Sequence, residues 1–368
     1  MVLTRRAHKA ITRWLPNEVI TEIIQQAASG TNLVALSRVS KLFHGLSLPI
    51  LYRNLHCKLS TAGYDSAMTL CATLSKTPSR AELVRSFVVE DMLEPLAHTG
   101  TLSPLLLKSL KLMRRLHHLS IQWDEGFSES VLEHCTFPDL RSCEITPPAL
   151  LGPDTSTDLV ASFLTRHPNL TRIRILSNAI LRPSATLRIP MRHLQIYRGP
   201  ANLLCSMDVV GLREARISRH GIEGPPLDTF ITRLGAMAGA DFAFFFSTAS
   251  RDPALCTAVV DSVSRNIPDT GILQLCWPAR DDVFDDELVA RIATCLARCT
   301  MLKYLAFPIE CDPLFLPVST SPGPPTALQT WSSACPTLEG CVFADFVWAI
   351  VSGEWVACRT SDFVASGS

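Results

Sequence analysis

A short apolar pattern that returns along most of the chain restricts its fold more than any other feature. In this pattern an apolar residue is followed by two others, a second apolar residue, one other, and a third apolar residue. The spacing suits a strand that points alternate side chains inward, after an apolar residue that turns the chain toward the core. Segments that match are LHHLSI (116–121), LRSCEI (140–145), LTRIRI (170–175), MRHLQI (191–196), LREARI (212–217), LKYLAF (302–307) and LEGCVF (338–343).

Weaker matches and helical segments lie between these copies. ILQLCW at 272–277 is a looser copy, LVRSFV at 83–88 is a degenerate first copy, and DFAFFFS at 241–247 hides another. Segments upstream of three copies have the spacing of helices, at 103–115, 156–169 and 285–300. We therefore expect an α/β chain in which short parallel strands and helices stack as a repeat. An irregular α/β domain without a true repeat is the alternative.

Residues 14–58 differ from the rest of the chain in the spacing of their apolar residues, which recur at helical spacing with no strand-like alternation. The pattern predicts three helices, the third of which should break at Pro49 and restart at Ile50. Three helices of this length can bury only a small core. The surplus of apolar side chains indicates a partner surface, supplied by the rest of the chain or by another protein.

The order of these residues resembles the F-box, in the divergent form abundant in mushroom-forming fungi. The resemblance rests on the Leu-Pro head at 15–16, the polar-acidic pair that follows it, and a Val-Ser-Lys-Phe step at 39, 40, 41 and 43 that spans the entry to the third helix. Phe43 and Tyr52 stand where the family usually has Trp. A helical cap on a larger domain would show similar stripes and is the alternative interpretation.

The resemblance implies that this module docks on the Skp-type adaptor of a cullin ubiquitin ligase. The residues expected to bind the adaptor are Leu15, Pro16, Ile20, Ile23, Leu33, Leu36, Val39 and Phe43. The downstream copies are similar to the irregular leucine-rich repeats that commonly follow an F-box in fungal proteins. The closing W…CP-x-L…W pattern of such proteins is matched by Trp331, Cys335, Pro336, Leu338, Trp348 and Trp355, which we expect to cap the repeats.

These patterns divide the chain into four parts and suggest a function. We expect a basic tail at 1–13, an F-box-like helical module at 14–58, an irregular leucine-rich-repeat domain with a C-terminal cap at 59–358, and a frayed tail at 359–368. The expected function is a non-catalytic substrate-receptor subunit of a ubiquitin ligase, which binds an unknown target protein through the repeats. A repeat scaffold that binds proteins outside any ubiquitin pathway is the alternative.

Composition argues against several other classes of protein. The 34 basic residues balance the 34 acidic ones, so the chain has no general attraction for nucleic acid or an anionic membrane. No apolar run approaches the ~20 residues that cross a bilayer. The 13 cysteines follow a start without the apolar segment of a signal peptide, so we expect them to be reduced, in the cytoplasm or nucleus.

Candidate chemical sites have simpler explanations. Cys295 and Cys299 suit a core, and the acidic run DDVFDDE at 281–287 suits the start of a helix better than a metal site. The sequence has no phosphate-binding glycine loop and no nucleophile elbow. We therefore expect no catalytic residue, metal or cofactor. A dispersed catalytic site stays as a third hypothesis, which a deep pocket with converging His and carboxylate groups would support.

Overall fold

The structure is a computed structural model that describes most of the chain. The described residues are 16–26, 30–60, 63–91, 99–122, 127–146, 153–176, 187–219, 225–248, 250, 252–276, 285–307, 326–343 and 346–359. The predicted tail at 1–13 and all but the first residue of the predicted tail at 359–368 lie outside these ranges, as does nearly all of the Pro-rich segment 317–326. The chain divides into two compact units, Met1–Arg141 and Ser142–Ser368.

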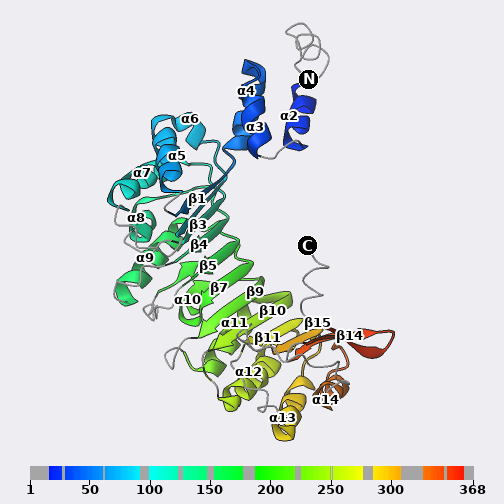
Figure 1. Ribbon diagram of the computed structural model, residues 1–368. Coiled ribbons are helices and arrows are strands. Elements are labelled where there is room, and N and C mark those ends of the chain that lie inside the picture. Colours follow the sequence, from blue (N-terminus) through cyan, green and yellow to red (C-terminus); the bar gives the residue numbers. More distant parts are fainter. Residues whose placement is uncertain are drawn as a thin grey trace. The chain divides into compact units, whose positions relative to one another are not determined.

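The first unit begins with three short helices and continues with strands that alternate with helices. Its elements are α2 (Asn17–Gln26), α3 (Gly30–Ser37), α4 (Lys41–Leu51), β1 (Asn54–Leu59), α5 (Tyr64–Lys76), α6 (Pro78–Ala81), β2 (Ser86–Asp91), α7 (Thr99–Leu112), β3 (His118–Gln122) and α8 (Phe127–His134). Strands β1, β2 and β3 pair in sequence order and are parallel. Figure 1 shows the three helices α2, α3 and α4 next to one another in blue.

The second unit repeats the alternation over a longer stretch. Its elements are β4 (Ser142–Ile145), α9 (Pro153–Arg166), β5 (Arg172–Ile175), β6 (Ile189–Pro190), β7 (Ile196–Pro200), α10 (Ala201–Cys205), β8 (Met207–Asp208), β9 (Leu212–Arg219), α11 (Leu227–Met237), β10 (Ala238–Thr248), α12 (Pro253–Asn266), β11 (Ile272–Cys276), α13 (Asp286–Leu296), β12 (Tyr304–Phe307), α14 (Thr326–Ala334), β13 (Gly340–Phe343), β14 (Phe346–Val351) and β15 (Glu354–Arg359). Strands β6 and β8 form a separate parallel pair.

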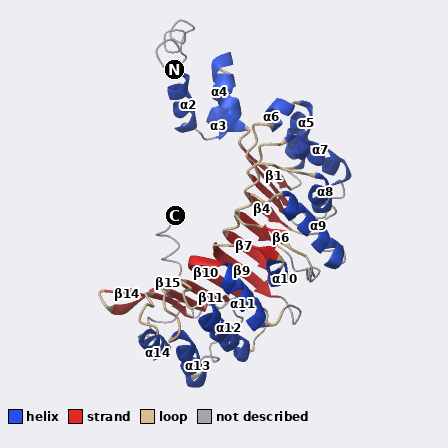
Figure 2. Ribbon diagram, turned by 180° about the vertical axis from the view of Figure 1, so that it is seen from behind, coloured by secondary structure: helices blue, strands red, loops and turns tan. Residues whose placement is uncertain are grey.

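In the main sheet of the second unit, helices cover one face and the other face is open. The strand order is β4-β5-β7-β9-β10-β11-β12-β13-β14-β15, and every pair up to β13 is parallel. Figure 2 shows the described helices on one side of these strands. Parallel strands need a crossover connection, and a helix on the same face each time gives one helical layer. The α/β class with mostly parallel strands is therefore as expected.

Apolar side chains form rows across the parallel strands because the strands pair in register. Ile173 of β5 pairs with Cys143 of β4 and with Tyr197 of β7, and all three are buried. Further along, Leu305 of β12 pairs with Leu273 of β11. Each fully buried Leu or Ile contributes about 1.5–3 kcal/mol relative to an exposed one, so these rows stabilise the pairing of the strands.

The predicted strand positions are confirmed for most copies of the pattern and corrected for three. In LTRIRI, Leu170, Ile173 and Ile175 are all buried, and LHHLSI, LRSCEI, LREARI and LKYLAF behave alike. The hidden copy at 241–247 lies within β10. The upstream segment at 285–300 contains α13, and those at 103–115 and 156–169 overlap α7 and α9, which begin a few residues earlier than predicted. In MRHLQI the third predicted position was wrong, since Ile196 faces outward and the next residue, Tyr197, is buried.

The copies at 83–88 and 272–277 are also shifted. Phe87 and Val89 point into the core where Ser86 and Val88 were expected to do so, because they pair with Leu119 and Ile121 of β3. In the other copy Leu275 is buried as predicted, Leu273 is buried in place of Ile272, and Trp277 lies outside the described residues. At 83–88 the adjacent apolar residues fit two frames, and pairing with the neighbouring strand selects one.

Two expectations about the N-terminal segment were wrong. Residues 14–58 do contain a strand, since β1 begins at Asn54 and pairs with β2 along its full length. The third helix does not break at Pro49, because α4 runs unbroken from Lys41 to Leu51 with Pro49 inside it. Pro49 lies in the last turn of α4, where its missing N–H removes a single helical hydrogen bond.

The C-terminal end departs from the parallel pattern. Strands β14 and β15 are antiparallel to their neighbours and continue the sheet as a hairpin, which turns at Ser352 and Gly353 with positive φ at both residues. The three tryptophans expected in the cap differ in burial. Trp331 and Trp348 are buried, and Trp355 is half-buried. Trp331 contacts Phe307 with a ring-centroid distance of 5.3 Å and donates a hydrogen bond to the carbonyl oxygen of Val289 at 3.1 Å.

Candidate protein-binding surface

The three N-terminal helices build a small core from a few residues. Ile20 and Ile24 lie one turn apart on α2, and both are buried together with Leu33 of α3. Half-buried side chains complete the cluster, namely Leu36, Leu42, Phe43, Leu46, Ile50 and Leu51. We call α2, α3, α4 and the turns between them the three-helix module. Its core is small because three helices of 8–11 residues enclose little volume.

The same module leaves a second set of apolar side chains in solvent. Val19 and Ile23 also lie one turn apart on α2, about 100° around the helix from the buried pair, and are 42% and 53% exposed. Val34 of α3 and Val39 in the turn before α4 are 42% and 58% exposed. Four of the ten large apolar side chains that are exposed in the described part of the chain thus belong to this module. These four residues are the candidate binding surface, because exposed apolar side chains that gather on one small module are typical of interaction sites.

The eight predicted adaptor-binding residues occupy three different environments. Ile20 and Leu33 are buried in the core of the three-helix module and offer no surface to a partner in this conformation. Leu36 and Phe43 are half-buried against that core. Pro16, Ile23 and Val39 are exposed, and Leu15 lies outside the described residues. The binding role of all eight stays a prediction.

Two exposed residues were not among the predicted contacts, namely Val19 and Val34. The sequence did signal Val19, because it shares with Ile23 the spacing that Ile20 shares with Ile24. The two pairs are centred about 100° apart around the helix, and a core built from three short helices covers only one of them. Val34 carried no signal of its own, because a single valine in an apolar helix can lie on either side.

Capping and one side-chain contact hold α4 in place. Ser40 begins the helix, and its hydroxyl accepts a hydrogen bond from the backbone N–H of Phe43 at 3.3 Å. At the other end, the hydroxyl of Tyr52 accepts a hydrogen bond from Arg80 of α6 at 3.2 Å, and the guanidinium carbon lies 5.6 Å from the centre of the Tyr52 ring. Tyr52 therefore links the three-helix module to the first strand-helix pair of the same unit.

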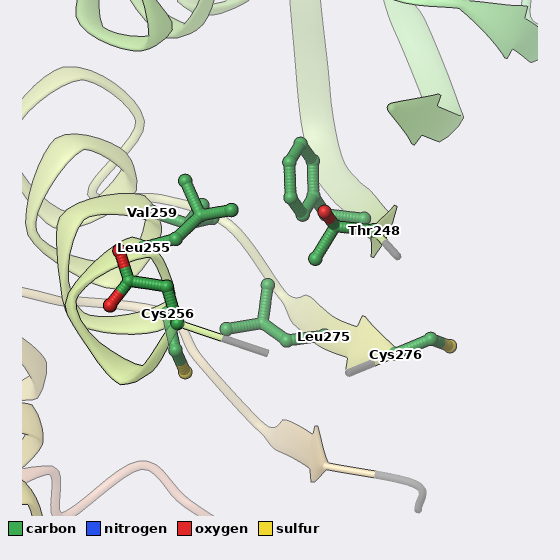
Figure 3. A pocket seen from close by; sticks show the side chains of 8 residues that line it. Thr248, Leu255, Cys256, Val259, Leu275 and Cys276 are labelled. Carbon is green, nitrogen blue, oxygen red and sulfur yellow. The ribbon is translucent and has the colours of Figure 1, made fainter. Parts of the chain in front are cut away.

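Two hollows of very different size lie among the described residues of the second unit. A cavity of about 10 Å³ lies between α12 and the carboxyl ends of β10 and β11, which is room for one water molecule. Figure 3 shows Leu255, Cys256 and Val259 of the helix around it, with the sulfur of Cys256 pointing away from that of Cys276. Burial raises the pKa of the Cys256 thiol to about 12, which keeps it protonated and unreactive at neutral pH.

A wider, open groove of about 450 Å³ lies beside β8 and the last turns of α11. Its charged lining residues are Arg192, Asp208 and Arg233, and no His or Cys lines it. The part of the chain that the structure describes contains no cluster of three His, Cys, Asp or Glu side chains suited to a metal. In the acidic run at 281–287, Asp285 caps α13 by accepting a hydrogen bond from the N–H of Leu288 at 2.7 Å, as expected, and 281–284 lie outside the described residues.

The buried histidine His167 and the described cysteines do not form a reactive site with one another. His167 is 2% exposed, and its Nδ1 lies 2.7 Å from the carbonyl oxygen of Phe163, so the ring donates its proton to that oxygen. Burial lowers the pKa of His167 and keeps the ring neutral, although the hydrogen bond acts in the opposite direction. The eleven cysteines whose state is described are all free, and all except Cys205 and Cys276 are buried.

Comparison with known proteins adds no family to this description. The sequence matches no family model and no curated protein. Among the described helices, none combines the length and the apolar character needed to span a bilayer.

Proposed function

We propose that this chain is an F-box substrate receptor, which binds a Skp-type adaptor through the three-helix module. It would bind a target protein through the strands and helices from β1 to β15, which we call the strand-helix part. The observation that carries the proposal is the division of α2 into a buried pair, Ile20 and Ile24, and an exposed pair, Val19 and Ile23. The apolar stripe of α2 is thus wider than the part that its own core buries, and the exposed part is what a second protein surface would cover.

The exposed residues suit an adaptor interface better than they suit contact with the rest of the chain. Val19, Ile23, Val34 and Val39 stay in solvent although the strand-helix part follows directly after α4. In a cap on a larger domain, these are the side chains that the domain would cover. Their exposure therefore favours a separate partner over the helical-cap interpretation.

We also propose that the strand-helix part is an irregular leucine-rich repeat. Support comes from the in-register parallel strands, from the buried residue that precedes most strands by two positions, and from the helices on a single face. Leu170, Leu194 and Leu302 are examples of that preceding residue. In this proposal its role in ubiquitin transfer is to hold a target close to the ubiquitin-charged enzyme, so it contributes proximity.

The experiment is co-expression of the full chain with a Skp-type adaptor and a cullin, followed by affinity purification. We expect all three proteins to purify together, and we expect the double substitution Ile23→Ser and Val39→Ser to remove the adaptor and the cullin. These positions are better targets than Ile20, whose substitution would damage the core of the module.

A matched control is available in the second unit. Ile350 and Val351 of β14 have the same side chains and are 41% and 55% exposed. Changing both to serine should leave adaptor binding intact. Equal loss in both double variants, or adaptor binding that survives the substitutions at Ile23 and Val39, would contradict the proposal. If the adaptor and the cullin never co-purify, the alternative of a binding protein outside the ubiquitin pathway holds.

A further inference from the structure

Three arginines form a row across adjacent strands of the second unit. Arg174 of β5 pairs with Arg198 of β7, which in turn pairs with Arg216 of β9. Neighbouring parallel strands are about 4.8 Å apart, so the three side chains start close together. Their strand neighbours, such as Ile173 and Ala215, point into the core. The arginines therefore project from the open face of the sheet, which the described helices do not cover.

The two outer arginines already have acidic partners. Arg174 forms an ion pair with Glu144 of β4 at 3.0 Å, and Arg216 forms one with Glu214 of its own strand at 2.5 Å. The guanidinium carbon of Arg216 also lies 4.2 Å from the centre of the Phe245 ring on β10. Each outer arginine of the row is thus paired with a carboxylate.

The central arginine is different. Among the described residues, Arg198 makes no side-chain hydrogen bond or ion pair, although it is only partly exposed. Partial burial lowers its pKa, and the charges of Arg174 and Arg216 lower it further, whereas Glu144 and Glu214 act in the opposite direction. An anion above Arg198 would relieve this repulsion and complete the row.

We propose that Arg198 binds an aspartate or glutamate side chain of a partner protein segment that lies on the open face of the sheet. The residues around it indicate the rest of the segment. Ile196, two positions earlier on β7, and Phe245 beside Arg216 are half-buried apolar side chains on the same face. The surface therefore fits an acidic residue with apolar neighbours. This inference rests on the proposed function only in identifying the partner as the target protein.

The charges favour a carboxylate over a polyanion. Arg174 and Arg216 each hold one carboxylate already, so a single guanidinium is left, and a guanidinium pairs with a planar carboxylate through two parallel hydrogen bonds. A nucleic acid would need a longer row of unpaired cations, and the chain has no excess of basic over acidic residues.

The test is fluorescence anisotropy with the full chain and three labelled peptides. One is rich in glutamate with interspersed leucine, the second has glutamine in place of glutamate, and the third has phosphoserine there. We expect the glutamate peptide to bind, its affinity to fall with salt, and the glutamine peptide not to bind. Arg198→Gln should lower the affinity for the glutamate peptide about tenfold, as expected for one charge-assisted hydrogen-bonded pair.

Two further variants keep this test decisive. Arg291→Gln removes an exposed, ion-paired arginine from α13 and should leave peptide binding unchanged. Arg198→Lys keeps the charge but loses the two-pronged geometry, so its affinity should fall between those of the native chain and Arg198→Gln, and it serves if Arg198→Gln fails to fold. Equal binding of the glutamate peptide by the native chain and the folded Arg198 variants would overturn the proposal. So would Arg198-dependent binding of the phosphoserine peptide alone, which would point to a phosphorylated partner.

Failure here can be separated from failure of the proposed function, because the peptide assay contains no adaptor. If the adaptor binds and no peptide does, only the proposal for Arg198 is overturned. If peptide binding depends on Arg198 and no adaptor binds, only the F-box assignment is overturned.

Discussion

The three-helix module and the sheet of the second unit bury their apolar residues to different degrees. In the sheet, inward side chains such as Ile173, Tyr197 and Leu305 are fully buried, and much of the open face carries charged residues. In the module, Ile20, Ile24 and Leu33 are buried, whereas side chains of the same kind on neighbouring positions face solvent. A strand in a sheet has neighbours on two sides and a helix above it, all supplied by one chain. Three short helices lack such neighbours, so the module leaves apolar side chains in solvent, which is why we propose a partner for it.

The largest loss of stability should follow from a substitution in the buried core of the second unit. Trp331→Ala removes a fully buried indole together with its hydrogen bond to Val289, and we expect a loss of about 3–5 kcal/mol in the free energy of unfolding. Chemical denaturation followed by circular dichroism measures it. Trp355→Ala on β15 is the control, because that side chain is half-exposed and should cost much less. Equal losses would mean that the C-terminal end is not packed as described.

Two adjacent isoleucines of α2 allow a buried and an exposed side chain of the same kind to be compared within the module. Ile24 is 1% exposed and Ile23 is 53% exposed. Ile24→Ala should destabilise the module by about 2 kcal/mol, the lower end for a buried isoleucine, because a small core relaxes easily. Ile23→Ala should change stability by less than about 0.5 kcal/mol. Hydrogen exchange of the α2 amides reports both values, and similar values for the two variants would show that α2 is not oriented as described.

The charged face of the sheet allows a prediction of intermediate size. Glu144→Gln leaves Arg174 without its partner beside the unpaired Arg198, and the side chain of Glu144 is only 15% exposed. We expect a loss of about 1 kcal/mol, limited by the solvent exposure of the arginine. Arg198→Gln should cause no loss, because it removes a repelled charge. Thermal unfolding of the two variants side by side checks the order, and a larger loss for Arg198→Gln would contradict it.

Much of the fold could be predicted from the sequence, and the failures have a common cause. Strand positions were clear where apolar and polar residues alternate, as at 170–175, and ambiguous where apolar residues adjoin, as in Phe87-Val88-Val89. Only pairing with a neighbouring strand, a non-local interaction, resolves the second case. The arginine row was hidden for the same reason. Arg174, Arg198 and Arg216 are separate residues in the sequence until the register places them side by side.

The candidate interface was predicted as a surface but not residue by residue. The surplus of apolar side chains in 14–58 is visible in the sequence, and the structure shows it as exposed valine and isoleucine. Which members of the stripe face the core depends on how the three helices pack. The sequence alone could not separate Ile20 from Ile23.

The smallest expected effect is the dependence of stability on pH that His167 gives to the second unit. His167 is buried and neutral, and its pKa in the folded chain is lowered by burial. The unfolded chain therefore binds a proton below about pH 6.5 that the folded chain does not, so stability should fall as the pH drops through that value. Above it both forms are neutral and the residue has no effect. Thermal unfolding at about pH 7.5 and pH 5.5 should show a drop that is smaller in His167→Gln, and an unchanged drop would assign the pH dependence to other groups.

We propose that a Skp-type adaptor covers the exposed apolar side chains of the three-helix module. Amide hydrogen exchange of the full chain, with and without a purified Skp-type adaptor, tests this most directly. We predict that protection rises in α2, α3 and the turn at Val39 and stays unchanged in the strands of the second unit. Protection that appears in those strands, or no change anywhere at saturating adaptor, would contradict the claim.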